Sequence, residues 1–557
     1  MNKYSEERKR LQLDGLLPEW YSTAGLQMFK EKYQWADTPK DQYAAIARTA
    51  ANHVRHVYPN AEEKFFNLLW NGWLSPSTPI LANMGRGIGL PVSCSGNYIH
   101  DSISGFYKAR SENAMLTKYG FGTSSYLNDI RPRGAAYKGG RASGVIPVLK
   151  GFVQDMEDVA QSSARRGAWA GYIDISHNDF DEIINLLSVA PDGLNIGWII
   201  HDDFLTRLKD NDPEAQRRWT TVIETKMVTG KGYLLFVDKI NRHRPIDYIY
   251  NNLYVKASNL CTEINLVSDE EHTFTCIISS MNYAKYNEWE KTDSIFWAIL
   301  FLDCVAQEFI DLAEGIEELS KAVRFTKKSR ALGLGACGLH TLFMKEGFSF
   351  DSLEAQFLHH AMFDNLKTKT KEASIELGRH LGIPEWCKKS KQRNTHLIAI
   401  APTKSTALIM GGVSEGINPV PALVYTQTTS AGEMQRIDPT FLAFLKEKGY
   451  NTPQHLKEIE DAFGSCQSVS WMTAEEKKLF RIAFEYDMSV ILRLASQRQK
   501  FIDQGQSLNL FIAGDADEEY IARIHQQAAE DEWIHQIYYI YSSANVAGSK
   551  GECEVCQ

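Results

Sequence analysis

The chain has 557 residues, and its 60 Lys and Arg against 69 Asp and Glu give a formal net charge of −9. With 44% apolar and 23% charged residues it is typical of a globular protein with a large core, not of a disordered chain. The acidic balance argues against nucleic-acid binding, the longest apolar run (295–302) is too short to cross a membrane, and residues 1–10 lack a secretory signal, so we expect a soluble, cytoplasmic protein.

Residues 1–73 predict a helical N-terminal region, because apolar residues follow helical spacing at 44–54 and 62–70. From residue 74 onward, short strand-like segments alternate with helical ones; segment 172–175, for example, precedes an amphipathic helix at 181–187. Such alternation is typical of parallel strands joined by crossover helices and predicts an α/β fold.

The rest of the chain continues this alternation of strands and helices up to a C-terminal segment of different composition. Further strand-like segments lie at 232–236, 264–267 and 397–400, and long amphipathic helices are expected at 294–312 and 474–494. Residues 542–557 are small and polar, as in a flexible tail.

Nine cysteines are scattered along the chain, which argues against a disulfide scaffold and a zinc ribbon. The one close pair is Cys553-x-x-Cys556, which could be half of a metal site, a redox pair or an accident of sequence. No His and carboxylate cluster suits a di-iron centre, so we expect no metal site in this chain.

Two glycine- or hydroxyl-rich segments could bind phosphate. The segment Gly333-x-Gly335-x-x-Gly338 fits a dinucleotide fingerprint, but the preceding residues 325–330 are too basic for a buried strand, which favours close packing against a helix. In segment 397–406 an apolar strand meets Pro402 and a helix then begins; its free N–H groups suit a phosphate, although a plain helix cap explains them equally well.

The segment Asn259-x-Cys261-x-Glu263 places an amide, a thiol and a carboxylate at every second residue. In an extended strand these three side chains share one face. A buried carboxylate is costly without a partner, so the pattern indicates thiol chemistry with a neighbouring base; the alternative is a surface strand with an incidental cysteine.

From about residue 74 to 541 the ordered motifs resemble the large, catalytic α subunit of ribonucleotide reductase. The resemblance is carried by segments 78–80, 93–94, 120–134, 162–170, 259–263, 274–282, 330–338, 401–406, 506–510 and 538–539. It implies a ten-stranded α/β barrel of two five-stranded halves at 74–541, a helical region at 1–73 without a recognisable ATP-cone, and a flexible redox tail at 542–557. It also replaces the dinucleotide interpretation with a family glycine turn.

The resemblance implies radical reduction of ribonucleoside diphosphates. Cys261 would be the thiyl radical, Glu263 the base on the 3′-hydroxyl, and Asn259 the group that orients the ribose. Cys94 would protonate the leaving 2′-hydroxyl and then form a disulfide with Cys276, which two thiols can do while supplying two electrons. Further implied groups are the redox shuttle Cys553 and Cys556, which thioredoxin or glutaredoxin would reduce, and the substrate-binding residues Thr78, Ser93, Ala401, Pro402, Thr403, Lys404, Ser405 and Thr406.

The adjacent Tyr538 and Tyr539 indicate a class I enzyme, in which they would pass a radical from a metal-containing β subunit to Cys261; the alternative is ordinary aromatic packing. A nucleoside triphosphate effector (ATP, dATP, dTTP or dGTP) would bind at the interface of an α homodimer. Its implied contacts are Asp101, Arg131, Arg165 and Arg166. Rival hypotheses are an adenosylcobalamin-dependent (class II) reductase, a nicotinamide-dependent dehydrogenase and a non-enzymatic helical scaffold.

Overall fold

The first half of the molecule is a parallel five-stranded sheet. The computed structural model describes residues 3–159, 167–189, 194–429 and 432–543. The five strands are β2 (Cys94–Tyr98), β3 (Gly122–Tyr126), β6 (Trp169–Asp174), β7 (Ile196–Ile200) and β8 (Tyr233–Phe236), each parallel to the next. Their residues are almost all buried, as a parallel sheet covered by helices requires.

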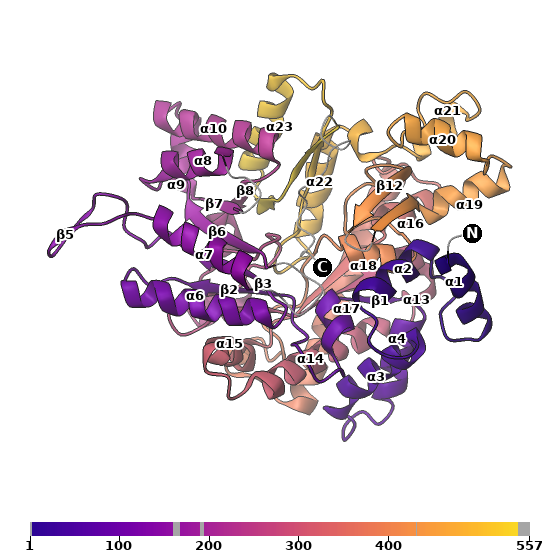
Figure 1. The fold of residues 1–557 in the computed structure, drawn as a ribbon, viewed down its shortest axis with the longest axis horizontal. Coiled ribbons are helices and arrows are strands. Elements are labelled where there is room, and N and C mark those ends of the chain that lie inside the picture. The colour runs from indigo at the N-terminus through magenta and orange to yellow at the C-terminus, as the bar shows by residue number, and fades with distance from the viewer. Residues whose placement is uncertain (1–2, 160–166, 190–193, 430–431, 544–557) are drawn as a thin grey trace.

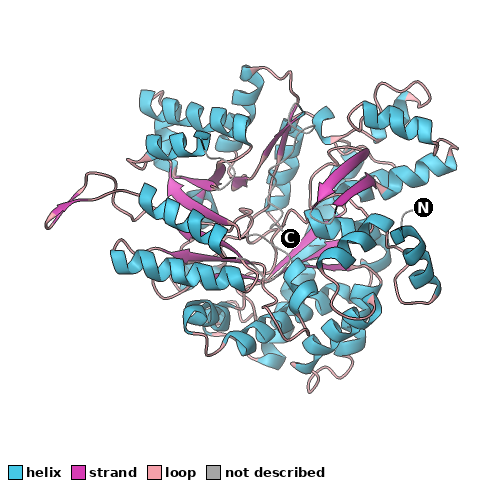
Figure 2. Ribbon diagram, viewed as in Figure 1, coloured by secondary structure: helices cyan, strands magenta, loops and turns pink. Residues whose placement is uncertain are grey.

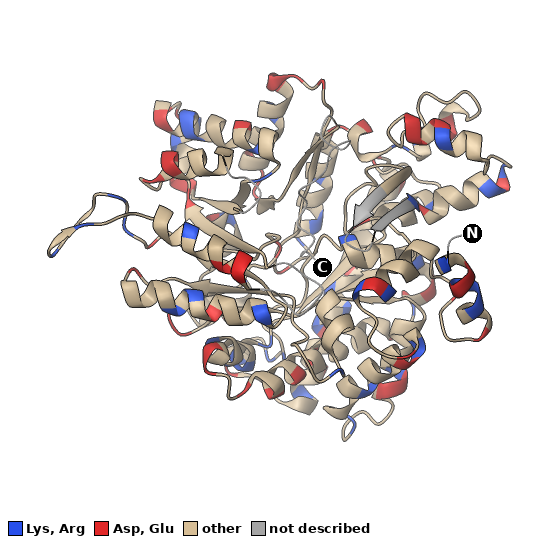
Figure 3. Cartoon of the chain, viewed as in Figure 1, with Lys and Arg blue, Asp and Glu red and all other residues tan. Residues whose placement is uncertain are grey.

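Helices cover the outer face of this half (Figure 1). They are α6 (Ile103–Lys118), α7 (Ile146–Asp158), α8 (Phe180–Val189), α9 (Asp202–Lys209) and α10 (Pro213–Thr229). Strand β6 followed by α8 confirms the strand and helix expected at 172–175 and 181–187. Lys, Arg, Asp and Glu residues are frequent along these outer helices, as along the other helices, whereas the strands are mostly uncharged (Figure 3).

The second half contains four further strands and one extended segment, each parallel to its neighbours. Strand β10 (Ile278–Asn282) pairs with β11 (Gly333–Cys337), and the N–H of Leu334 bonds the carbonyl of Leu397 in the next segment, 397–400. A parallel bridge joins Ile400 to Gln506, and β14 (Leu510–Ile512) pairs with β16 (Ile540–Ser542). The expected strand at 397–400 is therefore present as a barrel segment held by neighbours on both sides.

Two antiparallel contacts close the barrel. Strand β9 (Phe274–Cys276), which leads directly into β10, pairs antiparallel with β2, and β15 (Gln536–Ile537), which precedes β16, pairs antiparallel with β8. The two halves, each with five strand positions when segment 397–400 is counted, therefore run in opposite directions and close one ten-stranded barrel, as expected from the sequence. Figure 2 shows the strands of the two halves on either side of the molecule. A short strand, β1 (Leu74–Pro76), extends the second half beside β10.

The N-terminal region is helical, as expected. Its helices are α1 (Lys3–Leu13), α2 (Thr23–Lys32), α3 (Pro39–Asn52) and α4 (Ala61–Trp70). Thr38 caps α3 by accepting a hydrogen bond from the N–H of Asp41, and Pro39 fits the first helical turn. Phe65 packs edge-on against Trp297 and Phe301 of α14 (Ser294–Ala313), so this region is anchored on the helix expected at 294–312.

The single helix expected at 474–494 is wrong. The segment forms α21 (Ala474–Leu479), a 3-10 turn (Ala483–Glu485) and α22 (Met488–Gln499). Glu485 accepts a hydrogen bond from the N–H of Ile482, and Asp487 caps α22 through the N–H of Ser489, so local caps interrupt the amphipathic pattern.

Gly333 and Gly335 lie inside barrel strand β11, and only Gly338 (φ +77°) lies at the turn into α16 (Leu339–Lys345), so the segment lacks the glycine-rich strand-to-helix turn of a dinucleotide site. A Cβ on Gly335 would lie 2.6 Å from the carbonyl oxygen of Ala399, and one on Gly333 would lie 3.1 Å from the Cβ of Ala399. The expectation of close packing is correct, but the partner is the neighbouring barrel segment and not a helix.

Among the described residues no helix combines the length and apolar character needed to cross a bilayer.

A buried charge cluster ties the helices to the second half of the barrel. Asp303 on α14, 2% exposed, bonds Arg330 at 2.7 Å and Arg393 at 2.8 Å. Burial alone raises the pKa of Asp303, but the two guanidinium groups outweigh it and lower the pKa to about 2. A lowered pKa means that the carboxylate stabilises the fold above the unfolded value of about 3.9 and loses this effect as the pH falls towards 2.

Replacing Asp303 with Ala is therefore expected to destabilise the protein by about 3–5 kcal/mol, because two buried guanidinium groups lose their counter-ion. Urea unfolding at neutral pH measures the loss. The control is Glu271→Ala, which breaks an exposed ion pair with Arg324 and should cost less than about 1 kcal/mol. Equal effects of the two substitutions would contradict the role given to the buried cluster.

Candidate functional site

The segment with Asn259, Cys261 and Glu263 is an irregular loop and not the expected extended strand; residues 264–267 are likewise not a strand. Thr262 has a φ of +66°, which turns the chain and breaks the period-two alternation. The side chains still meet: the Asn259 amide donates to Glu263 Oε1 at 3.0 Å. All three residues are buried, which excludes the alternative of a surface strand.

Both halves of the barrel hold this loop from inside. The hydroxyl of Tyr172 on β6 donates to the carbonyl of Asn259 at 2.6 Å. From the second half, Ser507 Oγ lies 2.7 Å from the carbonyl oxygen of Cys261, and the N–H of Gly505 donates to the carbonyl of Glu263 at 2.8 Å. The loop therefore crosses the barrel interior and presents Cys261 between the two half-sheets.

The expected redox pair faces each other across the seam between the half-barrels. Cys94 on β2 is the direct antiparallel partner of Cys276 on β9, and both are buried thiols. Directly opposed residues in antiparallel strands have Cα atoms about 4.5–5.5 Å apart, within the range a disulfide spans. The two cysteines can therefore form a disulfide without moving the backbone far.

Burial raises the pKa values of Glu263 and Cys276 and so favours the uncharged form of each side chain. Burial raises the pKa of Glu263 to about 7, against hydrogen bonds from the backbone, Asn259 and Ser507 that lower it. Burial also raises the pKa of Cys276, and Cys94 and Glu263 add to that effect. The carboxyl can thus accept or release a proton near neutral pH, while Cys276 remains a thiol.

The tyrosine pair lies in the same apolar cluster as Cys261, Cys94 and Cys276. The rings of Tyr538 and Tyr539 have centroids 4.1 Å apart, and both side chains are buried. They occupy the point where the strand changes its partner from β8 to β14, at the second seam of the barrel. This position places two oxidisable rings inside the barrel.

The expected substrate residues lie on three segments: the start of α5, the residue before β2 and the loop at α18. Thr78 begins α5 (Thr78–Asn83) and Ser93 precedes β2; both are buried, and within the described residues neither hydroxyl has a hydrogen-bond partner. The loop before α18 (Lys404–Ile409) contains Ala401, Pro402 and Thr403, with Lys404, Ser405 and Thr406 in the first turns of the helix. Buried hydroxyls without partners are expected where a polar ligand binds.

Thr403 does not cap α18, which removes the plain-cap interpretation of this loop. Its φ is +55°, and its hydroxyl accepts a hydrogen bond from the N–H of Gly416 at 2.8 Å. The loop is thereby fixed to the segment that follows α18.

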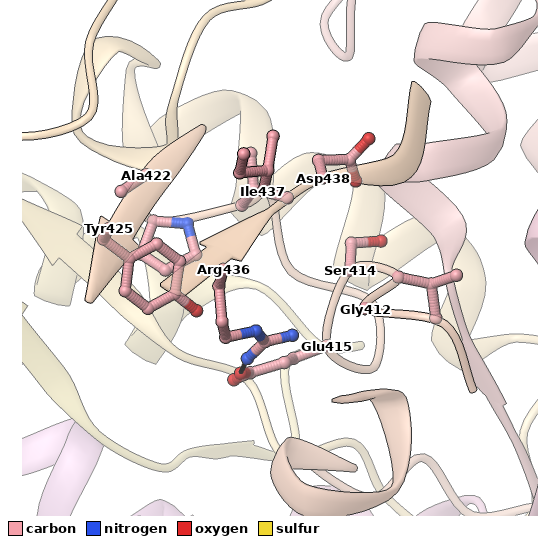
Figure 4. A pocket seen from close by; sticks show the side chains of 11 residues that line it. Gly412, Ser414, Glu415, Ala422, Tyr425, Arg436, Ile437 and Asp438 are labelled. Atoms are coloured by element: carbon pink, nitrogen blue, oxygen red, sulfur yellow. Dashed lines mark hydrogen bonds and ion pairs between the residues drawn. The ribbon is translucent and has the colours of Figure 1, made fainter. Parts of the chain in front are cut away.

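A small hollow lies behind that segment (Figure 4). Arg436 bonds Glu415 at 2.8 Å beside Tyr425, and the hollow, about 20 Å³, holds no more than one water molecule. The ion pair supports the loop, and the hollow is too small for a nucleotide.

The two expected effector residues that the structure describes form an ion pair: Arg131 Nε lies 2.5 Å from Asp101 Oδ2. Arg165 and Arg166 lie outside the described residues, as do Cys553 and Cys556 of the expected redox shuttle. In the described part of the chain no group of three or more His, Cys, Asp or Glu side chains could hold a metal ion.

Some site residues were missed by sequence reasoning. Tyr233 on β8 packs against both tyrosines, with ring centroids 4.9 Å from Tyr538 and 5.6 Å from Tyr539. Lys226 on α10 is fully buried and donates to the carbonyl of Tyr538; burial lowers its pKa to about 7. A lysine in an ordinary helix gives no local signal of this contact; only the folded barrel brings it there.

The described structure is thus an α/β barrel with one buried cysteine on an inner loop and one pair of opposed cysteines in its wall. Family models match residues 92–215, 212–392 and 384–539 as the ribonucleotide reductase barrel domain, and residues 19–89 as its all-alpha domain. The chain therefore belongs to the ribonucleotide reductase large-subunit family. This excludes the dehydrogenase and helical-scaffold hypotheses.

Individual relatives agree with this assignment. A ribonucleoside-diphosphate reductase large subunit of Frog virus 3 (isolate Goorha) is 31% identical, covering 90% of this chain and 93% of the relative. The solved class Id ribonucleotide reductase alpha subunit of Actinobacillus ureae is 35% identical with a TM-score of 0.87, covering 95% and 99% of the two chains. A vitamin B12-dependent ribonucleoside-diphosphate reductase of Thermoplasma acidophilum is 27% identical, covering 88% and 66%.

Proposed function

We propose that this chain is the catalytic subunit of a class I ribonucleoside-diphosphate reductase, which converts ribonucleoside diphosphates to deoxyribonucleoside diphosphates for DNA synthesis. In this proposal residues 1–73 are a helical region, residues 74–541 the catalytic barrel and residues 542–557 a redox tail. The observation that carries it is the convergence of Cys261, the opposed pair Cys94 and Cys276, and the two tyrosines in one buried cluster.

The proposed chemistry balances in atoms and electrons. A Cys261 thiyl radical abstracts the 3′-hydrogen of the ribose, and Glu263 takes the proton of the 3′-hydroxyl. The 2′-hydroxyl leaves as water with the proton of Cys94, and Cys276 gives its hydrogen to C2′, so that the two sulfurs form a disulfide and supply two electrons. Glu263 then returns its proton to the 3′-oxygen. Cys261 then returns its hydrogen to C3′ and becomes a thiyl radical again. The pKa of Glu263, about 7, suits both directions of its proton transfer.

The substrate is proposed to lie against the second half-barrel. Its diphosphate would meet the loop 401–406 and the start of α18, with Thr78 and Ser93 donating to the nucleotide. The support is the pair of buried hydroxyls without partners and the fixed, left-handed Thr403. Asn259, held by Glu263 and by Tyr172, would orient the ribose.

A nucleoside triphosphate effector is proposed to bind near Asp101 and Arg131, at the interface of an α homodimer. Exposed apolar side chains begin directly beside Asp101, at Ile103 and Tyr107 on α6, and such a surface favours association with a second copy. Arg165 and Arg166 are proposed to complete this site.

Addition of candidate β subunits tests the proposed function directly. The purified chain alone should form no dCDP from CDP, and a metal-containing β subunit should start the reaction. Turnover with adenosylcobalamin and no β subunit would instead assign the chain to class II, where the Thermoplasma relative belongs by name.

Removing the tail cysteines by Cys553→Ser and Cys556→Ser is expected to stop turnover with thioredoxin or glutaredoxin while preserving reduction by a small dithiol. The reason is that only the relay to Cys94 and Cys276 is lost; sixteen residues after Tyr541 extend to at most ~50 Å. The measurement is dCDP formation with each reductant. Full activity with thioredoxin would exclude the shuttle.

A further inference from the structure

The Ser507 hydroxyl lies between two oxygen acceptors of the catalytic loop. Its Oγ is 2.7 Å from the carbonyl oxygen of Cys261 and 3.0 Å from Glu263 Oε2, and Ser507 is 1% exposed. A hydroxyl carries one hydrogen and can donate it to only one of these oxygens at a time. While Glu263 is ionised, the two acceptors therefore compete for a single donor.

A proton on Glu263 removes this competition. Oε1 already accepts a hydrogen bond from the Asn259 amide at 3.0 Å, so the proton belongs on Oε2, which faces Ser507. The protonated carboxyl then donates to Ser507 Oγ, and the Ser507 hydroxyl is free to donate to the Cys261 carbonyl. Both contacts are satisfied only in this state.

The backbone around Ser507 is fixed, so the hydroxyl responds by rotation alone. The N–H of Ser507 donates to the carbonyl of Ile400 at 2.8 Å. The side chain of Gln506 is held by the buried Arg498 at 2.6 Å, by the carbonyl of Ala495 at 2.9 Å and by Gln499 at 2.9 Å. The backbone of residue 507 is therefore fixed beside the carboxyl group that gains and loses the proton.

We propose that Ser507 is a positioning residue that couples the proton on Glu263 to the backbone of Cys261. Its hydroxyl donates to the carboxylate before Glu263 takes a proton from substrate, and to the Cys261 carbonyl afterwards. The cysteine loop is thus tightened while Glu263 holds the proton, which is the interval in which Cys261 carries the hydrogen taken from the ribose. The catalytic roles of Glu263 and Cys261 in this statement rest on the proposed function; the hydrogen-bond switch itself does not.

The titratable groups that face Glu263 are thiols. Cys261 belongs to its own loop, and Cys276 faces it from β9 with Cys94 opposite. The pKa of Cys276 is raised by burial, so this thiol stays neutral over the range in which Glu263 titrates. Hydrogen bonding to Ser507 and Asn259 is therefore the main local control that a substitution can change.

Infrared titration of the full-length protein without substrate tests the switch. The Glu263 carboxyl band is identified by its loss in Glu263→Gln. Ser507→Ala should move the protonation midpoint of Glu263 upward by about one pH unit, because the carboxylate loses a donated hydrogen bond. Ser507→Thr keeps a hydroxyl and should restore the midpoint. Ser507→Cys, a near-isosteric weak donor, should give a smaller upward shift and covers the case in which the alanine variant does not fold.

Tyr172→Phe is the matched control, because it also removes a hydroxyl from a loop carbonyl but does not touch Glu263. It should leave the midpoint unchanged. An unmoved midpoint in both Ser507→Ala and Ser507→Cys, or an equal shift in Tyr172→Phe, would overturn the proposal. In the reductase assay the apparent pKa of the acidic limb of the pH profile should move upward together with the infrared midpoint. If wild-type protein reduces no CDP with any β subunit, the proposed function fails while the infrared result still decides the role of Ser507.

Discussion

Cys261→Ser is expected to lower dCDP formation by at least about a thousandfold, the scale of losing a residue on which every later step depends. An alcohol O–H bond is much stronger than a thiol S–H bond, so a buried tyrosyl radical cannot generate a serine oxygen radical. The substitution changes one atom of a buried side chain in a loop held by Tyr172, Ser507 and Gly505, so the fold should persist. Measurement of dCDP under multiple turnover, with CDP and effector binding measured in parallel, checks both statements.

The matched control for this substitution is Cys337→Ala. Cys337 is equally buried but lies on β11, outside the apolar cluster that contains Cys261. It should retain most of the activity at a modest cost in stability. Multiple turnover by Cys261→Ser, or an equal loss in Cys337→Ala, would show that Cys261 has no special chemical role.

The sequence grouped the three residues of the cysteine loop correctly in space but for a wrong reason. Alternation along a strand grouped Asn259, Cys261 and Glu263, but the chain turns at Thr262 and the grouping comes from a direct amide-to-carboxylate bond. A left-handed threonine leaves no pattern in a single sequence. The cost of burying a carboxylate still pointed to a polar partner, because that argument does not depend on secondary structure.

The pattern of strands and helices predicted the α/β class of the fold, but it did not predict which strands pair to close the barrel. Alternating strands and helices indicated parallel sheets. They did not indicate that one continuous stretch of chain, β9 followed by β10, pairs with both halves: β9 is antiparallel to β2, and β10 is parallel to β11. Which strand crosses from one half to the other is decided by contacts between residues almost two hundred positions apart, such as Cys94 and Cys276. For the same reason Lys226, Tyr172 and the hydroxyl of Ser507 could not be assigned to the site from local sequence.

Replacement of either relay tyrosine is expected to abolish activity with a β subunit as completely as loss of Cys261. Phenylalanine has no hydroxyl to lose a proton and is far harder to oxidise, so on the proposed route Tyr539→Phe would block entry of the radical and Tyr538→Phe would block its transfer inward. The rings are buried and 4.1 Å apart, so removal of one hydroxyl should leave their packing intact. CDP binding should therefore be unchanged while dCDP formation falls below detection.

The Tyr233→Phe variant tests whether the tyrosine pair carries the radical or only packs in the core. Tyr233 contacts both rings, and its hydroxyl lies 3.4 Å from that of Tyr539, yet it is not part of the proposed route. Its loss removes the contacts of that hydroxyl with Asn195 Oδ1 at 3.3 Å and with Tyr539, and should lower turnover by less than about tenfold, the equivalent of 1.4 kcal/mol. If Tyr233→Phe is as inactive as the other two, the route must include a third ring; if Tyr538→Phe and Tyr539→Phe stay active with the β subunit, the tyrosines are packing residues and the radical reaches Cys261 by another path.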